Sequence, residues 1–308
     1  MMGLVQMQML GNRAESQIMP SPTHRVAVVT GASAGIGREA AKQLAAQGWR
    51  VIATGRDAAR CQTAEAEISA AASGPPATFI RADLSLMADV RRLASEIAAL
   101  TPRIDILANN AGGMPARFEM TAEGLEANFA GNHLGPFLLT NLLLPQLRAA
   151  AKASPKGAVR IINTSSDRSE FIPTLNLDDM QNLEGWSCGL AYCSGKLANV
   201  LHARALAGRL AADGIIAHSF HPGTVDSNFF DDLEDSTRAH TDTLYKMPVA
   251  EGADTLLWLA LAEEPGESSG GYWFERGPRV ANAVVDDSAF IERFWGESEK
   301  LVGGGSST

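Results

Sequence analysis

A short apolar run, three glycines and an amphipathic segment in succession restrict the fold of this chain more than any other feature. Residues 25–30 read as a buried strand, a turn with Gly31, Gly35 and Gly37 follows, and a helical pattern covers residues 38–47. Glycines at a strand-to-helix turn let the backbone approach a diphosphate, whose charge the helix N-terminus stabilises. Because the glycines stand in this context, the segment predicts a dinucleotide-binding site rather than a merely flexible turn.

A second pattern places a phenol and an ammonium group four residues apart. Tyr192 and Lys196 open a segment that has apolar residues at helical spacing. Positions i and i+4 lie on one face of a helix, so Lys196 can reach the surroundings of Tyr192. A nearby cation favours the phenolate and is expected to lower the pKa of Tyr192 toward neutrality.

Strand-like and helix-like segments alternate through the rest of the chain, without a Pro/Gly/Ser-rich linker in the middle. This alternation predicts one α/β domain with a mainly parallel, about seven-stranded sheet. The domain is expected to cover residues 25–300, between a loosely ordered N-terminal arm (1–24) and a flexible tail (301–308). We expect strands at 25–30, 50–54, 77–81, 104–108, 158–164, 214–219 and 270–274, and helices at 36–47, 57–72, 86–100, 124–152, 189–212 and 249–262.

Polar and glycine residues follow most of these strands directly. Ligands of open parallel sheets bind beyond the carboxyl ends of the strands, so residues at these positions are expected to converge. They are Gly31, Asp83, Asn110, Ser166 and Pro222.

Taken together, these motifs resemble the short-chain dehydrogenase/reductase family, over about residues 25–274. The order and separation of the motifs carry the resemblance: Thr30-Gly31-x-x-x-Gly35-Ile36-Gly37, Asp83-Leu84, Asn109-Asn110-Ala111-Gly112, Asn132, Ser166, Tyr192-x-x-x-Lys196 and Pro222-Gly223. The resemblance implies a single Rossmann-type, doubly wound domain.

Residues 132–140 and 191–201 resemble the retinol dehydrogenase branch, which includes relatives of the WW-domain oxidoreductase and of protochlorophyllide reductase. Gly195 departs from this branch, which usually has a serine before the lysine. Many retinol dehydrogenases have an N-terminal membrane anchor. The apolar pieces before Arg13 are too short for a membrane span, so no such anchor is expected here.

The resemblance assigns four catalytic residues. Tyr192 would be the acid or base at the substrate oxygen, and Lys196 would lower the pKa of Tyr192 and hold the nicotinamide ribose. Ser166 would form a hydrogen bond with the substrate oxygen. Asn132 would position a water linked to Lys196.

Residues of the same type lie next to some of these four and are alternatives for their roles. Ser165 precedes Ser166, and strand alternation lets only one of them face the site; the branch favours Ser166. Asn128 lies one helical turn before Asn132, and the family motif singles out the latter. His133 and His221 flank family motifs and are expected to be packing or hydrogen-bonded residues.

The cofactor preference is set where the second strand ends. Family members that prefer NAD place an acidic residue there, whereas this chain has Gly55 followed by Arg56. A guanidinium suits a 2′-phosphate, so NADP(H) is favoured over NAD(H); Asp57 could alternatively serve as a helix cap. The predicted cofactor-binding residues are Gly31, Ser33, Gly35, Ile36, Gly37, Arg56, Asp83, Leu84, Asn110, Ala111, Gly112, Tyr192, Lys196, Pro222, Gly223, Val225 and Ser227.

Composition limits the other partners. The net charge of −9 disfavours nucleic acid and anionic membrane surfaces. No His-Glu pair has the spacing of a zinc protease and no G-x-S-x-G elbow occurs, so no metal site or serine hydrolase is expected. Three cysteines without a C-x-x-C pair indicate a reducing, cytoplasmic location.

The expected activity is NADP(H)-dependent interconversion of a hydrophobic ketone or aldehyde and its alcohol. Reduction of a conjugated C=C bond and a non-catalytic dinucleotide sensor are the rival interpretations. A homodimer is expected, with a monomer as the alternative. Insertions at 168–190 and 223–248 are expected to form walls and a lid over an apolar substrate site, with these candidate lining residues: Met114, Phe118, Phe171, Ile172, Trp186, Phe229 and Phe230.

Overall fold

The sheet that holds the molecule together contains eight strands. The computed structural model describes residues 24–227, 229 and 243–303. The strand order is β3-β2-β1-β4-β5-β6-β7-β8, and every neighbouring pair is parallel except β7 and β8. The strands are β1 (Val26–Val29), β2 (Arg50–Gly55), β3 (Thr78–Arg81), β4 (Ile106–Asn109), β5 (Arg160–Thr164), β6 (Ile216–Phe220), β7 (Tyr272–Phe274) and β8 (Gly277–Pro278).

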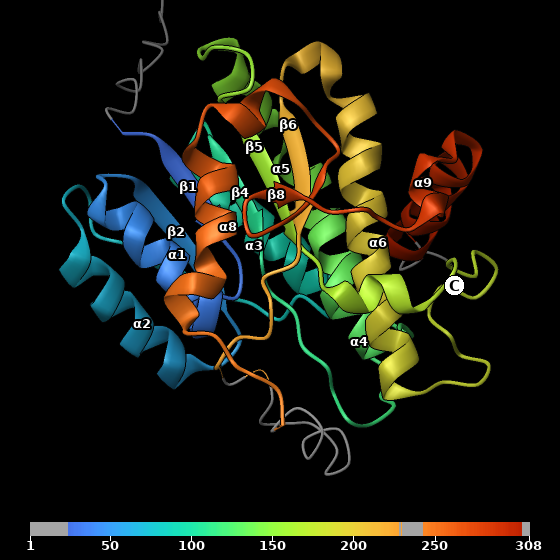
Figure 1. Cartoon of the computed structure of the whole chain (residues 1–308). Helices are drawn as coiled ribbons and strands as arrows, with labels where there is room; N and C mark the ends of the chain where they lie inside the picture. The colour runs from blue at the N-terminus through green and yellow to red at the C-terminus, as the bar shows by residue number, and fades with distance from the viewer. Residues whose placement is uncertain (1–23, 228, 230–242, 304–308) are drawn as a thin grey trace, which may run out of the picture.

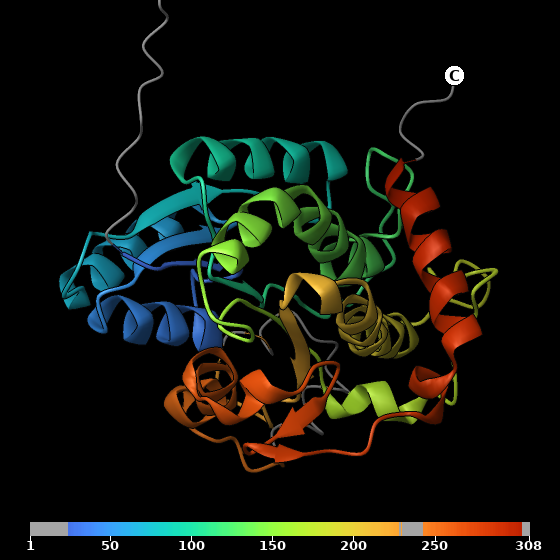
Figure 2. The same ribbon diagram turned by 90° about the horizontal axis from the view of Figure 1, so that it is seen from above.

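Helices cover both faces of this sheet (Figures 1 and 2). One face carries α1 (Gly35–Ala46), α2 (Ala58–Ala71) and α8 (Val249–Leu261). The other carries α3 (Met87–Leu100), α5 (Gly135–Lys152) and α6 (Cys188–Arg209), with α9 (Ser288–Gly303) outside α6. Strands buried on both faces form continuous apolar runs, as in Val26–Val29, all fully buried. Short 3-10 helices are η2 (Asp167–Phe171), η3 (Ala211–Asp213), η5 (Glu264–Glu267) and η6 (Ala283–Asp286).

The strand order reverses direction between β1 and β4, which are paired through Val28 and Leu107. From β1 the chain moves outward to β2 and β3, and from β4 it moves to the opposite edge. A crevice opens at the carboxyl ends of strands where the order reverses in this way, and this crevice is where such folds bind ligands. The topology therefore places the site before any side chain is considered.

The segment expected as one long helix at 124–152 consists of three pieces. Ala127–Phe129 (α4) is a short α-helical turn, Ala130–Leu134 (η1) is a π-helical turn, and α5 follows without a break. Single π turns inside α-helices often occur at functional sites. Asn132 lies at the centre of this one.

Two further features differ from the expectations. The antiparallel β8 makes the sheet eight-stranded rather than about seven-stranded. The helix α9 was not anticipated, and it includes residues 301–303 that were assigned to a tail. Residues 1–23 of the expected arm and Phe230 lie outside the described residues. Among the residues described, no helix combines the length and hydropathy needed to span a membrane.

Candidate active site

The glycine turn after β1 packs directly against the end of β4. Gly31 has φ = +67°, and a Cβ there would lie 2.7 Å from the Cα of Ala111. A Cβ at Gly37 would lie 2.4 Å from Nδ2 of Asn110. Only glycine fits these two close approaches, so the turn can pack directly against the end of β4.

Hydrogen bonds fix the relative position of these two loops. The amides of Asn110 and Ala111 both donate to Oγ1 of Thr30 at 3.0 Å, and Nδ2 of Asn110 donates to the carbonyl of Thr30 at 3.1 Å. These three hydrogen bonds hold Thr30, at the end of β1, against Asn110 and Ala111, at the end of β4. Three predicted cofactor residues, Gly31, Gly37 and Asn110, are in contact there.

Tyr192 and Lys196 occupy the first turns of α6, whose N-terminus is capped by Ser187. Nζ of Lys196 lies 5.4 Å from the centre of the Tyr192 ring and donates to the carbonyl of Thr164 at 3.3 Å. Both side chains are buried. The pairing inferred from their spacing is present, and Thr164 connects it to the end of β5.

Burial dominates the protonation of both groups. It raises the pKa of Tyr192, and a hydrogen bond with the Ser166 side chain acts in the opposite direction. It lowers the pKa of Lys196 to about 8. The expected lowering of the Tyr192 pKa is therefore wrong for the protein alone. Burial destabilises the phenolate by more than the surrounding polar groups stabilise it.

The two serines after β5 point to different sides. Ser165 is buried, and its hydroxyl donates to the main-chain carbonyl of Lys196 at 2.7 Å. The hydroxyl of Ser166 donates to Oδ1 of Asp167 at 3.0 Å and accepts from the amide of Arg168 at 3.2 Å. Ser166 is therefore the serine beside the Tyr192 phenol, and Ser165 holds α6 against the strand.

Asn132 lies between the end of β4 and α6. Its Nδ2 donates to Oδ1 of Asn128 at 2.7 Å and to the carbonyl of Gly113 at 2.8 Å. A Cβ on Gly112 would lie 2.6 Å from Oδ1 of Asn132 and 3.0 Å from Nζ of Lys196. Gly112 thus leaves the space in which Asn132 and Lys196 come near each other, and Asn128 supports Asn132 rather than replacing it.

The predicted residues after β6 lie on a segment tied to the start of α8. Val225 forms a parallel bridge with Met247, and a Cβ on Gly223 (φ = +84°) would lie 2.3 Å from Cε of Met247. A Cβ on Gly35 would lie 3.3 Å from Cβ of Ser227, so this segment reaches the glycine turn. Pro222 begins the same stretch.

Asp83 and Leu84, after β3, serve local structure. Oδ1 of Asp83 accepts from the amide and the hydroxyl of Ser85 at 3.0 and 2.7 Å. Leu84 is buried, and its carbonyl would lie 2.2 Å from a Cβ on Gly135. Ile36, on the first turn of α1, packs against the core on the α1 side of the sheet.

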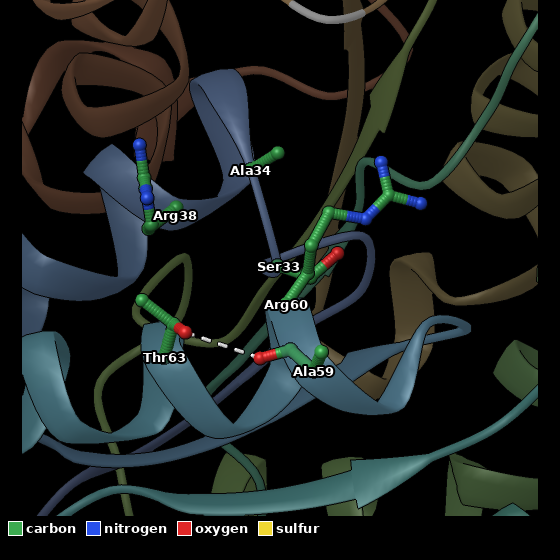
Figure 3. Close-up of a pocket in the computed structure, with 6 residues that line it drawn as sticks. All are labelled: Ser33, Ala34, Arg38, Ala59, Arg60 and Thr63. Carbon is green, nitrogen blue, oxygen red and sulfur yellow. Dashed lines mark hydrogen bonds between the residues drawn. The ribbon is translucent and has the colours of Figure 1, made fainter.

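A pocket of about 300 Å³ lies between the N-terminal ends of α1 and α2 (Figure 3). Its lining includes the predicted Ser33 and two arginines that the sequence analysis missed, Arg38 and Arg60. Arg38 directly follows the last glycine of the turn, a position that could have revealed it. Asp57 caps α2 by accepting from the amide of Arg60 at 2.8 Å, which matches its alternative role as a helix cap.

Arg56 is exposed at the end of β2, and its carbonyl accepts from Nε of Arg81 at 2.9 Å. Arg38 pairs with Glu67 at 3.2 Å and Arg60 with Asp57 at 3.7 Å, so both arginines at this end of the crevice already have a carboxylate partner. The ring of Phe229 lies 5.6 Å from the Tyr192 ring, and Phe118 packs edge-on against Trp186 at 5.6 Å.

The two flanking histidines are hydrogen-bonded, as expected. Nδ1 of His221 accepts from the amide of Asp167 at 3.1 Å. Nε2 of His133 lies 3.0 Å from the hydroxyl of Ser298 on α9. Burial lowers the pKa of both imidazoles, so they are neutral near pH 7.

Several known proteins are similar to this chain in sequence and in fold. Retinol dehydrogenase 12 of Homo sapiens is 35% identical over 288 residues, which cover 91% of this chain and 86% of the relative. A Streptomyces sp. (strain C5) protein named "Putative daunorubicin C-13 ketoreductase DnrU" is 34% identical over 92% of this chain and 98% of its own. The solved Pseudomonas aeruginosa RhlG/NADP active-site complex superimposes with a TM-score of 0.64 and 29% identity, covering 80% of this chain and 93% of that one.

The family model for short chain dehydrogenases matches residues 25–238, which include the glycine turn, the four expected catalytic residues and the segment after β6. The order of the strands and the convergence of these residues at one edge of the sheet agree with that match. This chain therefore belongs to the short-chain dehydrogenase/reductase family, and it is an oxidoreductase of Rossmann-type fold.

Proposed function

We propose that this chain is an NADP(H)-dependent enzyme that interconverts a hydrophobic ketone or aldehyde and its alcohol. The observation that carries the proposal is the meeting of Tyr192, Lys196 and Ser166 where α6 crosses the end of β5. A proton donor, a cation and a hydroxyl thus lie beside the crevice where the family binds its cofactor.

The residues have separate tasks in carbonyl reduction. NADPH, when bound, supplies the hydride to the carbonyl carbon. Tyr192 gives its phenolic proton to the developing alkoxide, and Ser166 offers a hydrogen bond to the same oxygen. The raised pKa of Tyr192 keeps that proton in place at neutral pH. Asn132 and Lys196, which meet across Gly112, supply the polar route by which the phenol is reprotonated.

The crevice fits a dinucleotide with a 2′-phosphate. Gly31 and Gly37 let the turn pack closely against the end of β4, and a glycine turn of this kind before a helix N-terminus is where such folds bind a diphosphate. The pocket beside Ser33 has Arg38 and Arg60 in its lining, and their ion pairs with Glu67 and Asp57 are solvent-exposed pairs that a phosphate could compete with. Guanidinium groups bind phosphate through charge-assisted hydrogen bonds, so these arginines support NADP(H) over NAD(H).

Aromatic side chains around Tyr192 support an apolar substrate. Phe229 faces the Tyr192 ring, Phe118 and Trp186 pack together, and Phe171 is 62% exposed. The printed names of two relatives, a retinol dehydrogenase and a ketoreductase, point to the same class of alcohol and carbonyl chemistry.

The test is NADPH consumption with a panel of hydrophobic aldehydes and ketones, using Tyr192→Phe as the matched variant. The ring and its packing remain in this variant, so NADPH binding should persist while turnover is lost. Retention of most of the activity would assign proton transfer to another group. A conjugated enone in the panel distinguishes C=C reduction, and binding without any turnover would favour a dinucleotide sensor.

The proposal extends to location and assembly. The three cysteines are buried and form no disulfide, which supports a reducing, cytoplasmic location, and cell fractionation tests this. Many members of this family form dimers or tetramers through the two long helices that correspond to α5 and α6. Here Arg209 of α6 pairs with Glu292 at 2.6 Å and lies over the Trp295 ring, so α9 occupies part of the α6 surface. This contact supports the monomer alternative over a homodimer, and light scattering decides between them.

A further inference from the structure

The residue that follows the active-site serine forms a contact that the proposed chemistry does not yet use. The hydroxyl of Ser166 has one hydrogen, and it is donated to Oδ1 of Asp167 at 3.0 Å. The Asp167 side chain is 40% exposed, so it stands at the rim of the site rather than in the core. Without substrate, Ser166 thus faces the Tyr192 phenol with its hydrogen directed to a carboxylate, and the hydroxyl turns from Asp167 to donate to a substrate oxygen.

His221 holds the backbone of Asp167. Its Nδ1 accepts from the Asp167 amide at 3.1 Å, which places the ring hydrogen on Nε2, 3.9 Å from Oδ2 of Asp167. The His221 ring also packs on Phe274 at 5.0 Å. Asp167 is therefore fixed from β6 and β7 as well as from its own turn.

We propose that Asp167 is a positioning residue that holds the Ser166 hydroxyl and sets a negative charge near the Tyr192 phenol. A carboxylate near a phenol disfavours the phenolate, so Asp167 keeps Tyr192 in the form that donates a proton. This inference rests on the proposed carbonyl reduction. It predicts that the enzyme retains its proton donor to a higher pH than burial of Tyr192 alone would allow.

Several charged groups near Tyr192 shift its pKa. The carboxylate of Asp167 raises the pKa of Tyr192, as does the nearby Cys193, and Arg168 lowers it. Among the described residues, the other ionisable groups around Asp167 and Tyr192 are Glu170, Lys196, His221, Tyr272 and Arg279.

Glu170 provides a matched control. It lies three residues after Asp167 on the same 3-10 helix, but it is paired with Arg279 and accepts from the Tyr272 hydroxyl at 3.3 Å. Removing the charge of Glu170 tests whether any negative charge on this 3-10 helix changes the pKa of Tyr192, and it leaves the hydrogen bonds of Ser166 intact. Tyr272, its partner, lies on β7 rather than in the active site.

The first experiment is the pH profile of kcat/KM for carbonyl reduction with NADPH, for wild type, Asp167→Asn and Glu170→Gln. Activity falls as pH rises through the pKa of the proton donor. Asp167→Asn should move this limb to lower pH by at least about half a unit, because a partly exposed charge is removed from beside a buried phenol. Glu170→Gln should leave it in place. Superimposable limbs for wild type and Asp167→Asn, or equal shifts in both variants, would overturn the proposal.

A second measurement does not depend on activity. The pKa of Tyr192 is followed by NMR with ring-labelled tyrosine, and the Tyr192→Phe spectrum identifies its signal. Asp167→Asn should lower this pKa in the protein without substrate. If no carbonyl compound is reduced but the Tyr192 pKa still falls, the proposed function fails and the role of Asp167 stands. An unchanged Tyr192 pKa overturns the role of Asp167 whatever the activity.

Discussion

The hydroxyl of Ser165 donates to the main-chain carbonyl of Lys196 at 2.7 Å, and so attaches the catalytic helix α6 to the end of β5. Ser166, the next residue, faces the Tyr192 side of the same junction. Two adjacent serines thus have different tasks: one fixes where the helix lies, and the other presents a hydroxyl to the site.

This division predicts different outcomes for two alanine variants. Ser165→Ala removes a buried hydrogen bond and should lower the free energy of unfolding by about 1–3 kcal/mol, because the Lys196 carbonyl loses a partner. Ser166→Ala should lower kcat by roughly a hundredfold or more, because it removes a donor to the developing oxyanion, and should cost less stability than Ser165→Ala, because its partners Asp167 and Arg168 are half-exposed. Urea unfolding and steady-state kinetics on both variants separate the two effects. Equal losses of stability would contradict the division.

Lys196 should make stability depend on pH in a defined window. Its pKa in the folded protein is lowered from 10.5 to about 8, so the folded state loses the proton before the unfolded state does. The free energy of unfolding should therefore rise between about pH 8 and pH 10.5, where the unfolded chain binds more protons. Lys196→Met should be more stable than wild type at pH 7 by roughly 2–3 kcal/mol, and the difference should shrink across this window. If the free energies of unfolding of wild type and Lys196→Met changed in parallel with pH, the lowered pKa of Lys196 would be refuted.

The arginines near Ser33 should set the cofactor preference. Arg38→Ala and Arg56→Ala each remove a guanidinium that can meet a 2′-phosphate, a contact worth about 1.5–3 kcal/mol. Each variant should lose roughly ten- to a hundredfold in kcat/KM for NADPH, with little change for NADH. Arg148→Ala is the control, since Arg148 pairs with Asp213 outside this pocket. Equal losses for both cofactors would give these residues a structural role, and a wild type that prefers NADH would overturn the NADP(H) proposal.

The contact between His133 and α9 should stabilise the fold. The Ser298 hydroxyl donates to the Phe294 carbonyl at 2.9 Å, so it accepts the hydrogen of Nε2 of His133. Ser298→Ala leaves that buried N–H without its acceptor and should lower the free energy of unfolding by about 1–3 kcal/mol. Ser288→Ala, at an exposed position of the same helix, should change it little. Similar values for the two variants would show that the contact contributes nothing.

Local patterns and chain topology were enough to predict the sheet and most of the site. The glycine turn, the spacing of Tyr192 and Lys196 and the ends of the strands are properties of short segments, and a parallel sheet brings those ends to one edge. The roles of Ser165 and Asn128 followed only when their hydrogen-bond partners were seen. Strand alternation shows that two serines differ, but it does not show what each one contacts.

Features that depend on distant packing were missed. Burial of Tyr192 by the assembled domain reverses the direction in which its pKa moves. The helix α9 has apolar residues at helical spacing, namely Phe290, Phe294 and Val302, so the helix itself could have been predicted. Its position against α6 could not, because it depends on distant partners such as Arg209, which lies over the Trp295 ring. Asp167 was not singled out from the sequence, because its contact with the Ser166 hydroxyl depends on the folded turn.

The π turn at Ala130–Leu134 makes the active site sensitive to the length of the chain. A π turn accommodates one residue more than the α-helical turns on either side. Deleting Gly131 would let this stretch close as an ordinary α-helix, and Asn132, now four residues after Asn128, would come to lie three residues after it. The two asparagines would still share a face, but the widened turn from which Asn132 donates to the Gly113 carbonyl would be lost, although every catalytic side chain would still be encoded. Relatives that keep this site are therefore expected to tolerate substitutions in this helix far better than single-residue insertions or deletions.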